Sequence, residues 1–210
     1  MKQVRRKGRF FIFEGTDGSG KSTQLRLLYD TLQNQGVPVV ATREPTDGKY
    51  GKKIRELYTN RDQCSKEEEL ELFLADRREH VETLILPALA EGKVVLCDRY
   101  VLSTVAYQGA IGFDPAQIFA RHNFAPQPDL AFLFTLPVHT GLERIIAGRG
   151  ESPNDFEQEA TLTRVAKIFA SLDLPYIIRI DATRSIDYLQ QLIYDHIQSV
   201  LTNMKDESEQ

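Results

Sequence analysis

Residues 15–22 read Gly-Thr-Asp-Gly-Ser-Gly-Lys-Ser, a glycine-rich turn that ends in a lysine and a hydroxyl group. In the spacing G-x-x-x-x-G-K-S/T, the glycines let several backbone N–H groups point into one concavity, and a following helix adds partial positive charge there. Lys21 supplies a full charge for the outer phosphates of ATP, and Ser22 offers a hydroxyl to Mg²⁺. The turn predicts a phosphate-binding loop made by Gly15, Asp17, Gly18, Ser19, Gly20, Lys21, Ser22 and Thr23.

A carboxylate follows a second apolar run. Residues 94–97 are Val-Val-Leu-Cys, and Asp98 comes directly after them. Ligands of open α/β sheets bind at the carboxyl ends of strands, so Asp98 is placed to join Ser22 in the Mg²⁺ shell, directly or through water. The alternative is a solvated aspartate at the end of a strand.

Three arginines are candidates for a second phosphate site. Arg43 follows one expected strand, Arg99 follows another, and Arg77 lies in a long helical pattern. Several guanidinium groups at the edge of the sheet that carries the phosphate loop would offset the repulsion between two phosphorylated substrates. Each arginine taken alone is more often a surface charge. Together they favour transfer of a phosphoryl group by positioning and charge stabilisation, with no general base required.

The elements that position these residues alternate between strands and helices. Short apolar runs predict strands at residues 10–13, 37–41, 93–97, 130–136 and 176–180. Helical spacing and capping residues predict helices at 24–35, 103–110 and 186–201, and another that begins at Asp114-Pro115. A further, long helix is expected to begin with a capping box at Ser65, to kink at Pro87 and to end at Gly92. The pattern predicts an α/β fold of the P-loop NTPase type, with a five-stranded parallel sheet flanked by helices on both faces.

Length and composition limit the class of protein. The 210 residues fit a single domain over residues 1–204, with a polar, disordered tail at 205–210. The net charge of −4 disfavours a nucleic-acid partner, including the role of a DNA-binding ATPase. Two cysteines without metal or redox spacing, and no long apolar segment, predict a cytoplasmic protein that does not span a membrane.

The phosphate loop alone serves many activities. The Asn-Lys-x-Asp tetrapeptide with which small GTPases read guanine does not occur in the sequence. These observations leave a small kinase or a nucleotide-binding regulator. Residues 148–155 are short, polar and rich in Gly, Ser and Pro, a composition typical of a mobile loop over a site.

Several motifs together resemble the thymidylate kinase family. They are Phe13-Glu14-Gly15 with the phosphate loop, Thr42-Arg43-Glu44-Pro45, Phe73-Leu74-Ala75-Asp76-Arg77, Asp98-Arg99-Tyr100, Ser103-Thr104 and Ala106-Tyr107-Gln108-Gly109. They occur in the order and spacing of the family, from about residue 9 to residue 110, and Pro128-Asp129-Leu130 continues the match more weakly.

The resemblance implies roles around the sugar and phosphate of an acceptor, dTMP. Asp17 would accept the 3′-hydroxyl of the deoxyribose, while Arg43 and Arg99 would hold the phosphate. Tyr107 would crowd the 2′ position and so favour deoxyribose. Taken without the resemblance, Tyr107 fits the hydrophobic core equally well.

The resemblance also implies roles around the base. Phe73 would stack on thymine, Arg77 would hydrogen-bond its O4 edge, and Gln108 or Ser103 would lie near the other edges. Phe73 is also at helical spacing with Leu70 and Leu74, so a core position is the alternative.

The family has two arrangements of its catalytic basic residues, in the phosphate loop or in a flexible lid. Here the loop carries no basic residue between Gly15 and Lys21, and the expected lid, residues 144–156, contains arginines. The resemblance therefore implies Lys21 and Arg99 as catalytic residues, with Arg149 as the first lid candidate and Arg144 as the second. Thr46-Asp47-Gly48 departs from the usual Gly-Gly after Arg-Glu-Pro, and the second half of the lid is poor in arginine.

The expected reaction is ATP + dTMP → ADP + dTDP with Mg²⁺, in the synthesis of dTTP. A kinase for another nucleoside monophosphate, such as dUMP or a modified thymidylate, is an alternative in the same class. A nucleotide-binding regulator that transfers no phosphate is the alternative from another class, motivated by the arginine-poor lid. The resemblance further implies a homodimer packed through helices.

Overall fold

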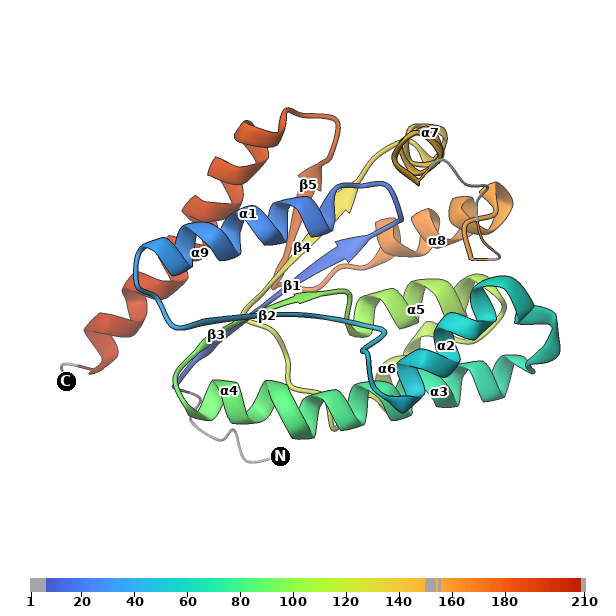
Figure 1. Cartoon of the computed structure of the whole chain (residues 1–210), viewed down its shortest axis with the longest axis horizontal. Coiled ribbons are helices and arrows are strands. Elements are labelled where there is room, and N and C mark those ends of the chain that lie inside the picture. The colour runs from blue at the N-terminus through green and yellow to red at the C-terminus, as the bar shows by residue number, and fades with distance from the viewer. Residues whose placement is uncertain (1–6, 150–153, 155, 209–210) are drawn as a thin grey trace.

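A five-stranded parallel sheet forms the centre of the computed structural model, which describes residues 7–149, 154 and 156–208 (Figure 1). The strands lie in the order β2-β3-β1-β4-β5. Their bounds are β1 Arg9–Gly15, β2 Val39–Arg43, β3 Val94–Asp98, β4 Leu130–Thr135 and β5 Ile177–Asp181. The predicted parallel sheet is confirmed, with boundaries that move by one or two residues.

The register brings the expected functional residues to one edge of the sheet. Asp98 in β3 pairs with Phe13 of β1 on one side and with Arg43 of β2 on the other. The phosphate loop follows β1, and Arg99 follows β3. Because parallel strands all end at the same edge, these segments meet beside the loop.

Helices cover both faces of the sheet, as expected (Figure 1). On one face α1 and α9 pack against Phe11 and Phe13, and on the other α4, α5 and α8 pack around Phe10 and Ile12. All four of these β1 side chains are buried, which is why the strand reads as a continuous apolar run. The helices are α1 Lys21–Asn34, α2 Lys49–Asn60, α3 Lys66–His80, α4 Leu86–Ala90, α5 Val101–Ala110, α6 Pro115–Arg121, α7 Val138–Arg149, α8 Glu159–Ser171 and α9 Ile186–Ser208.

Local signals in the sequence account for several helix ends. Ser65 and Glu68 form the predicted capping box, and the Asp114 side chain accepts a hydrogen bond from the backbone of Ala116. Around Pro87 the chain forms a π-helical turn (Val81–Ile85) that joins α3 to α4. In a regular α-helix the ring of Pro87 would clash with the backbone carbonyl of Thr83, four residues earlier. Thr83 lies inside this turn, and the wider π-helical geometry relieves the clash. Gly92, with φ 82°, follows α4 as expected.

Helix α2 and the end of helix α9 differ from the expectations. The sequence pattern does not predict α2, whose sequence is mostly polar and buries only Gly51, Ile54 and Leu57. Helix α9 runs to Ser208, so the expected end near Leu201 is wrong and most of the expected disordered tail is helical. No glycine or proline interrupts the chain between Leu201 and Ser208, which explains why the helix continues.

The sequence also predicts two free cysteines and no helix that spans a membrane. Cys64 and Cys97 are both free thiols, the first partly buried and the second fully buried. Within the described ranges, none of the helices combines the length and the apolar character that crossing a bilayer requires.

Candidate functional site

The phosphate loop joins the end of β1 to the start of α1. Gly18 has φ 74°, and a Cβ placed on it would lie 2.2 Å from the carbonyl oxygen of Gly141 in α7, so only glycine fits. Gly20 is the N-cap residue of α1, and within the described part of the chain no side chain accepts a hydrogen bond from the first turn of the helix. The first N–H groups of this helix are therefore open to a ligand anion, as the sequence predicts.

Lys21 lies inside the loop. Its side chain is 5% exposed, and Nζ donates to the carbonyl oxygen of Thr16 at 2.8 Å and contacts Ser19 Oγ at 3.3 Å. Burial, together with the positive charge of Arg99, lowers the pKa of Lys21 to about 8, although Asp17 opposes this shift. A buried ammonium surrounded by loop oxygens is suited to bind phosphate, which would replace those contacts with stronger ones.

Ser22 and Asp98 lie together, as predicted. The Ser22 hydroxyl donates to Asp98 Oδ2. A hydroxyl and a carboxylate are the hard oxygen ligands that Mg²⁺ prefers, and both lie beside the phosphate loop. The donor set therefore fits the predicted Mg²⁺ site, and its metal role stays a prediction.

A second group of metal-ligating side chains lies nearby. Ligand atoms of Glu44, His80 and Cys97 all lie within 4.8 Å of one another, and all three residues are buried. Glu44 is ion-paired with Arg77, His80 Nδ1 is 2.9 Å from Glu44 Oε1, and His80 Nε2 is 2.7 Å from Thr42 Oγ1. Burial also raises the pKa of the Cys97 thiol well above its usual value. Thr42, His80, Glu44 and Arg77 therefore form a hydrogen-bonded cluster, and the Cys97 thiol donates instead to the carbonyl oxygen of Arg99 at 3.1 Å.

Arg99 connects the phosphate loop to a neighbouring pocket. Its guanidinium donates to Asp17 Oδ1 at 2.6 Å, to the carbonyl oxygen of Gly15 at 3.1 Å and to Ser103 Oγ at 3.1 Å. Burial alone would raise the pKa of Asp17, but the charges of Arg99 and Lys21 outweigh it and hold that pKa below its usual value. Asp17 is therefore a carboxylate.

The backbone at Arg99 is strained. Among the described residues, it is the one non-glycine residue in the left-handed region, with φ 67°. Its N–H donates to the carbonyl oxygen of Phe13 at 2.9 Å, and the next N–H, of Tyr100, donates to Glu14 Oε1 at 2.9 Å. The buried Glu14 side chain also accepts from the Ser103 hydroxyl. These bonds hold the turn that aims Arg99 at the loop.

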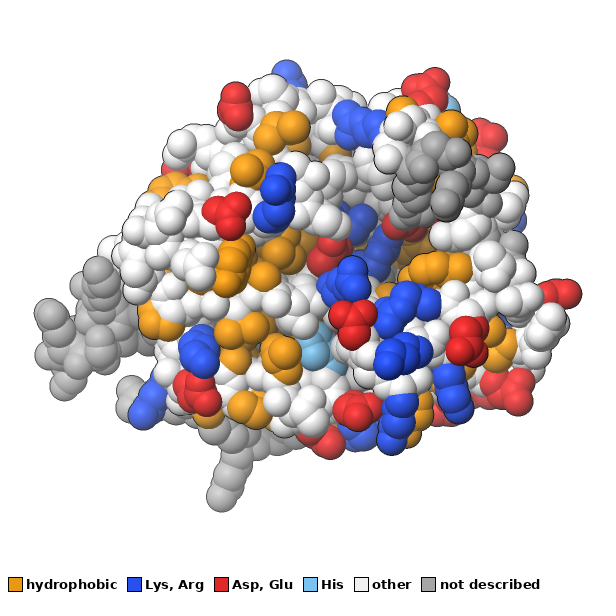
Figure 2. Space-filling view, viewed as in Figure 1, with side chains coloured by type: hydrophobic (Ala, Val, Ile, Leu, Met, Phe, Trp, Pro, Cys, Tyr) orange, Lys and Arg blue, Asp and Glu red, His pale blue; other side chains and the backbone are white. Residues whose placement is uncertain are grey.

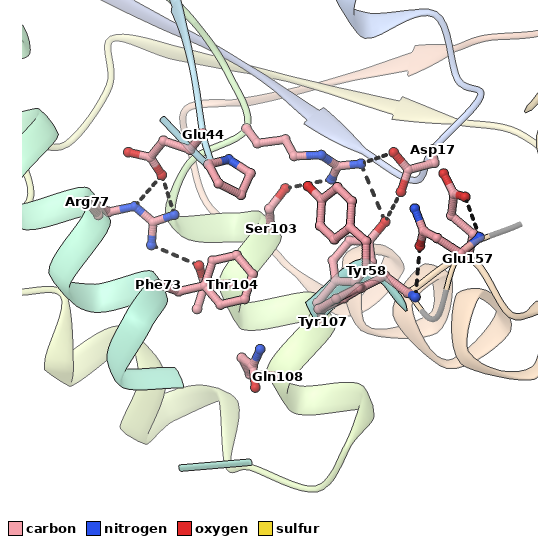
Figure 3. A pocket seen from close by; sticks show the side chains of 14 residues that line it. Asp17, Glu44, Tyr58, Phe73, Arg77, Ser103, Thr104, Tyr107, Gln108 and Glu157 are labelled. Carbon is pink, nitrogen blue, oxygen red and sulfur yellow. Dashed lines mark hydrogen bonds and ion pairs between the residues drawn. The ribbon is translucent and has the colours of Figure 1, made fainter. Parts of the chain in front are cut away.

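The pocket beside Arg99 contains every predicted dTMP-binding residue except Arg43 (Figure 3). Tyr107 lies against Asp17, with its hydroxyl donating to Asp17 Oδ2 at 2.8 Å. Gln108 borders the pocket, but its side chain is fully buried and its Nε2 donates to Glu69 Oε1 at 2.6 Å. The pocket lining is Asp17, Glu44, Pro45, Tyr58, Phe73, Arg77, Arg99, Ser103, Thr104, Tyr107, Gln108, Asn154, Phe156 and Glu157.

Arg43 lies in the adjoining groove, which Ser22 and Asp98 also line. Its exposed guanidinium is paired with Asp47 Oδ1 at 3.0 Å, in the segment that departs from the usual sequence of the family. Figure 2 shows Lys and Arg side chains gathered around the hollow in this face of an otherwise acidic molecule. An anion that binds there would meet Arg43 on the side of Ser22 and Asp98, and Arg99 on the side of the pocket.

Several residues that line the pocket have no binding role assigned from the sequence. Thr104 shares a face of α5 with Ser103 and Tyr107, so helical spacing could have identified it. Phe156 packs edge-on against Tyr58 and Phe73, at ring distances of 5.5 and 6.4 Å. No local pattern signals that this residue of the expected lid closes the pocket.

Of the two arginines expected in the lid, the structure describes the side chain of Arg144 but not that of Arg149. Arg144 Nη1 donates to the carbonyl oxygen of Ala182 at 3.2 Å, after the end of β5. Arg149 is the last residue of α7, and its side chain lies outside the described part of the structure. The expected catalytic roles of both therefore stay predictions.

Comparison with known proteins agrees with this geometry. A family model described as thymidylate kinase matches residues 13–193. A thymidylate kinase of Desulfotalea psychrophila is 55% identical over 194 residues, which cover 92% of this chain and 96% of that protein. Thymidylate kinases of Xanthomonas euvesicatoria (46% over 185 residues; 88% and 81% of the two chains) and Xanthomonas campestris (47% over 180 residues; 86% and 78%) are also similar. The chain belongs to the thymidylate kinase family.

Proposed function

We propose that this chain transfers the terminal phosphate of ATP to dTMP, giving ADP and dTDP. The observation that carries the proposal is the position of Arg99, which contacts both the phosphate loop at Gly15 and Asp17 and the pocket residue Ser103. A guanidinium at this junction can contact the acceptor phosphate while the donor lies in the loop. The family membership supports the same reaction.

On the donor side, the loop N–H groups and Lys21 bind the outer phosphates of ATP. Ser22 and Asp98 would hold Mg²⁺, which neutralises phosphate charge when bound. Arg43, in the same groove, adds positive charge where the two phosphates approach each other. The acceptor oxygen of a monophosphate is already a nucleophile, so these residues need only position it and stabilise charge.

On the acceptor side, the pocket offers a partner for each part of dTMP. Asp17 is an ionised acceptor for the 3′-hydroxyl, and Tyr107 beside it crowds the 2′ position. Phe73 presents its ring to the base. Arg77 is a donor for a base carbonyl, as argued below.

Activity should depend on pH through Lys21. Because its pKa is lowered to about 8, the free enzyme loses the ammonium charge as pH rises through that value. ATP binds the charged form, so kcat/KM for ATP is expected to fall above pH 8, as measured by initial rates from pH 6.5 to 9.5. A Lys21→Arg variant, which stays charged, serves as the control, and an equal fall in that variant would contradict the assignment to Lys21.

The lid arginine should act only on the transition state. Replacing Arg149 with alanine is expected to lower kcat by about 10²-fold and leave dTMP affinity unchanged, because the charge it stabilises develops during transfer. Single-turnover rates and equilibrium binding of dTMP measure the two quantities separately. An unchanged kcat would move the role to Arg144 or another residue.

A coupled assay of ADP release tests the function across dTMP, dUMP, dCMP and dGMP. Turnover with dTMP, and dTDP as the product, supports the proposal. Turnover with another monophosphate but none with dTMP would overturn the substrate. Binding of ATP without formation of any nucleoside diphosphate product would instead support a regulatory protein.

The proposal also includes a lid over residues 144–156, a homodimer and a cytoplasmic location. The resemblance to the family supports the lid and the dimer, and the two free thiols agree with a reducing compartment. Light scattering of the purified protein tests the dimer.

A further inference from the structure

Arg77, the residue expected to read the base, is held on three sides. Nε and Nη2 donate to Glu44 Oε2 at 2.8 and 2.5 Å, and Nη1 donates to Thr104 Oγ1 at 2.9 Å (Figure 3). Nη1 also lies 2.5 Å from His122 Nε2. Arg77 is 1% exposed, although it borders the pocket, so these contacts fix the plane of its guanidinium.

His122 is a neutral acceptor in this contact. Its Nδ1 lies 2.7 Å from the carbonyl oxygen of Ile118, which can only accept, so Nδ1 carries the hydrogen. Nε2 is then left with a lone pair, and that lone pair accepts from Arg77. Burial and the charge of Arg77 lower the pKa of His122 to about 3, in agreement with a neutral ring.

The other side of Arg77 is anchored as well. Glu44 Oε1 contacts His80 Nδ1 at 2.9 Å, so the carboxylate that pairs with Arg77 is itself oriented. Burial would raise the pKa of Glu44, but Arg77 and His80 outweigh it and lower that pKa. The guanidinium is thus fixed between a segment that follows β2 and one that follows α6.

The number of hydrogen bonds decides what Arg77 can offer a ligand. A guanidinium has five N–H donors. Glu44 takes one each from Nε and Nη2, and Thr104 and His122 take the two from Nη1. One N–H, on Nη2, has no partner among the described residues. Arg77 therefore presents a single donor, which suits a carbonyl oxygen and repels an amino group.

We propose that His122, which does not line the pocket, is a positioning residue for recognition of the acceptor base. By accepting one Nη1 hydrogen, it holds Arg77 so that the remaining Nη2 hydrogen meets a base carbonyl. This favours thymine and uracil, which carry O4, over cytosine, which carries an amino group at that position. The inference rests on the proposed function and names what sets the base preference of the site.

Two substitutions separate positioning from a general loss of structure. His122→Leu removes the hydrogen-bond acceptor. His122→Gln keeps one, because the glutamine side-chain oxygen is separated from the backbone by the same number of bonds as His122 Nε2. In His122→Leu, KM for dTMP is expected to rise about tenfold while kcat and KM for ATP change less than about threefold. The ratio of kcat/KM for dTMP over dCMP is expected to fall by a similar factor, and His122→Gln to restore most of both losses. His196→Leu, on α9 away from the pocket, is the matched control.

Three results would overturn the inference. His122→Leu could leave KM for dTMP and the dTMP preference unchanged. It could weaken ATP and dTMP equally together with a lower Tm, which indicates a structural role. His122→Gln could be as impaired as His122→Leu. Failure of the proposed function is distinct from these, because it appears as a wild-type protein with no turnover of dTMP.

Discussion

Replacing Lys21 with methionine is expected to lower kcat by about 10³-fold or more, since a charge that acts directly on the transferring phosphate is worth that much in phosphoryl transfer. Lys21 is buried within the phosphate loop, with its Nζ 2.8 Å from the carbonyl oxygen of Thr16. The loop N–H groups and the helix terminus stay in place in the variant, so ATP binding should weaken less than turnover. Single-turnover kinetics with saturating dTMP measure the chemical step.

The methionine variant should fold normally. Methionine matches the length of the lysine stem. Relief of a buried ammonium is offset by the lost contact with Thr16 and the lost charge near Asp17, so only a small change in stability is expected. Thermal unfolding and ATP binding serve as controls. A kcat within about tenfold of the wild type, in a variant that binds ATP, would contradict the role of Lys21.

Arg99→Ala is expected to lower kcat/KM for dTMP by about 10³-fold, because one guanidinium contacts the phosphate loop and the acceptor pocket at once. The variant should also lose stability. Arg99 and Asp17 form a partly buried ion pair, so removing Arg99 is expected to cost about 1–3 kcal/mol, because Asp17 is left without its main counter-charge. Initial rates and thermal unfolding report the two effects.

Two further substitutions separate the effects of Arg99. Arg99→Gly removes the same side chain but suits φ 67°, so it should be more stable than Arg99→Ala by about 1 kcal/mol and equally inactive. Adding Asp17→Asn to Arg99→Ala should recover part of the stability and none of the activity. A double variant with restored turnover would show that Arg99 acts only by balancing Asp17.

The parts of this structure that follow from short sequence patterns were predictable. The buried β1 strand, the glycine spacing of the phosphate loop and the capping residues Ser65 and Asp114 each depend on neighbours within a few positions. The edge where Arg43, Asp98 and the loop meet follows from the parallel sheet. These features depend on backbone geometry, which local sequence encodes strongly.

The contacts that refine the site were not predictable, because they join distant residues. His122 lies 45 positions from Arg77 in the chain, and nothing in its own neighbourhood distinguishes it from a surface histidine. Phe156 reaches Tyr58 and Phe73 from a segment that reads as a polar loop. Helix α2 carries Tyr58 but is held by few buried side chains, so its pattern is weak. The positions of His122, Phe156 and α2 all depend on tertiary packing, which local sequence patterns do not reveal.

The proposed function requires an acceptor nucleotide in the pocket between Phe73, Arg77 and Arg99, next to ATP in the phosphate loop. A crystal structure with dTMP, Mg²⁺ and a non-hydrolysable ATP analogue tests it directly. We expect thymine to lie against Phe73 with a carbonyl oxygen on Arg77 Nη2, and the dTMP phosphate to lie within hydrogen-bond distance of Arg99. Nucleotide density elsewhere, with this pocket still filled by the side chains that line it, would show that the acceptor binds at another site.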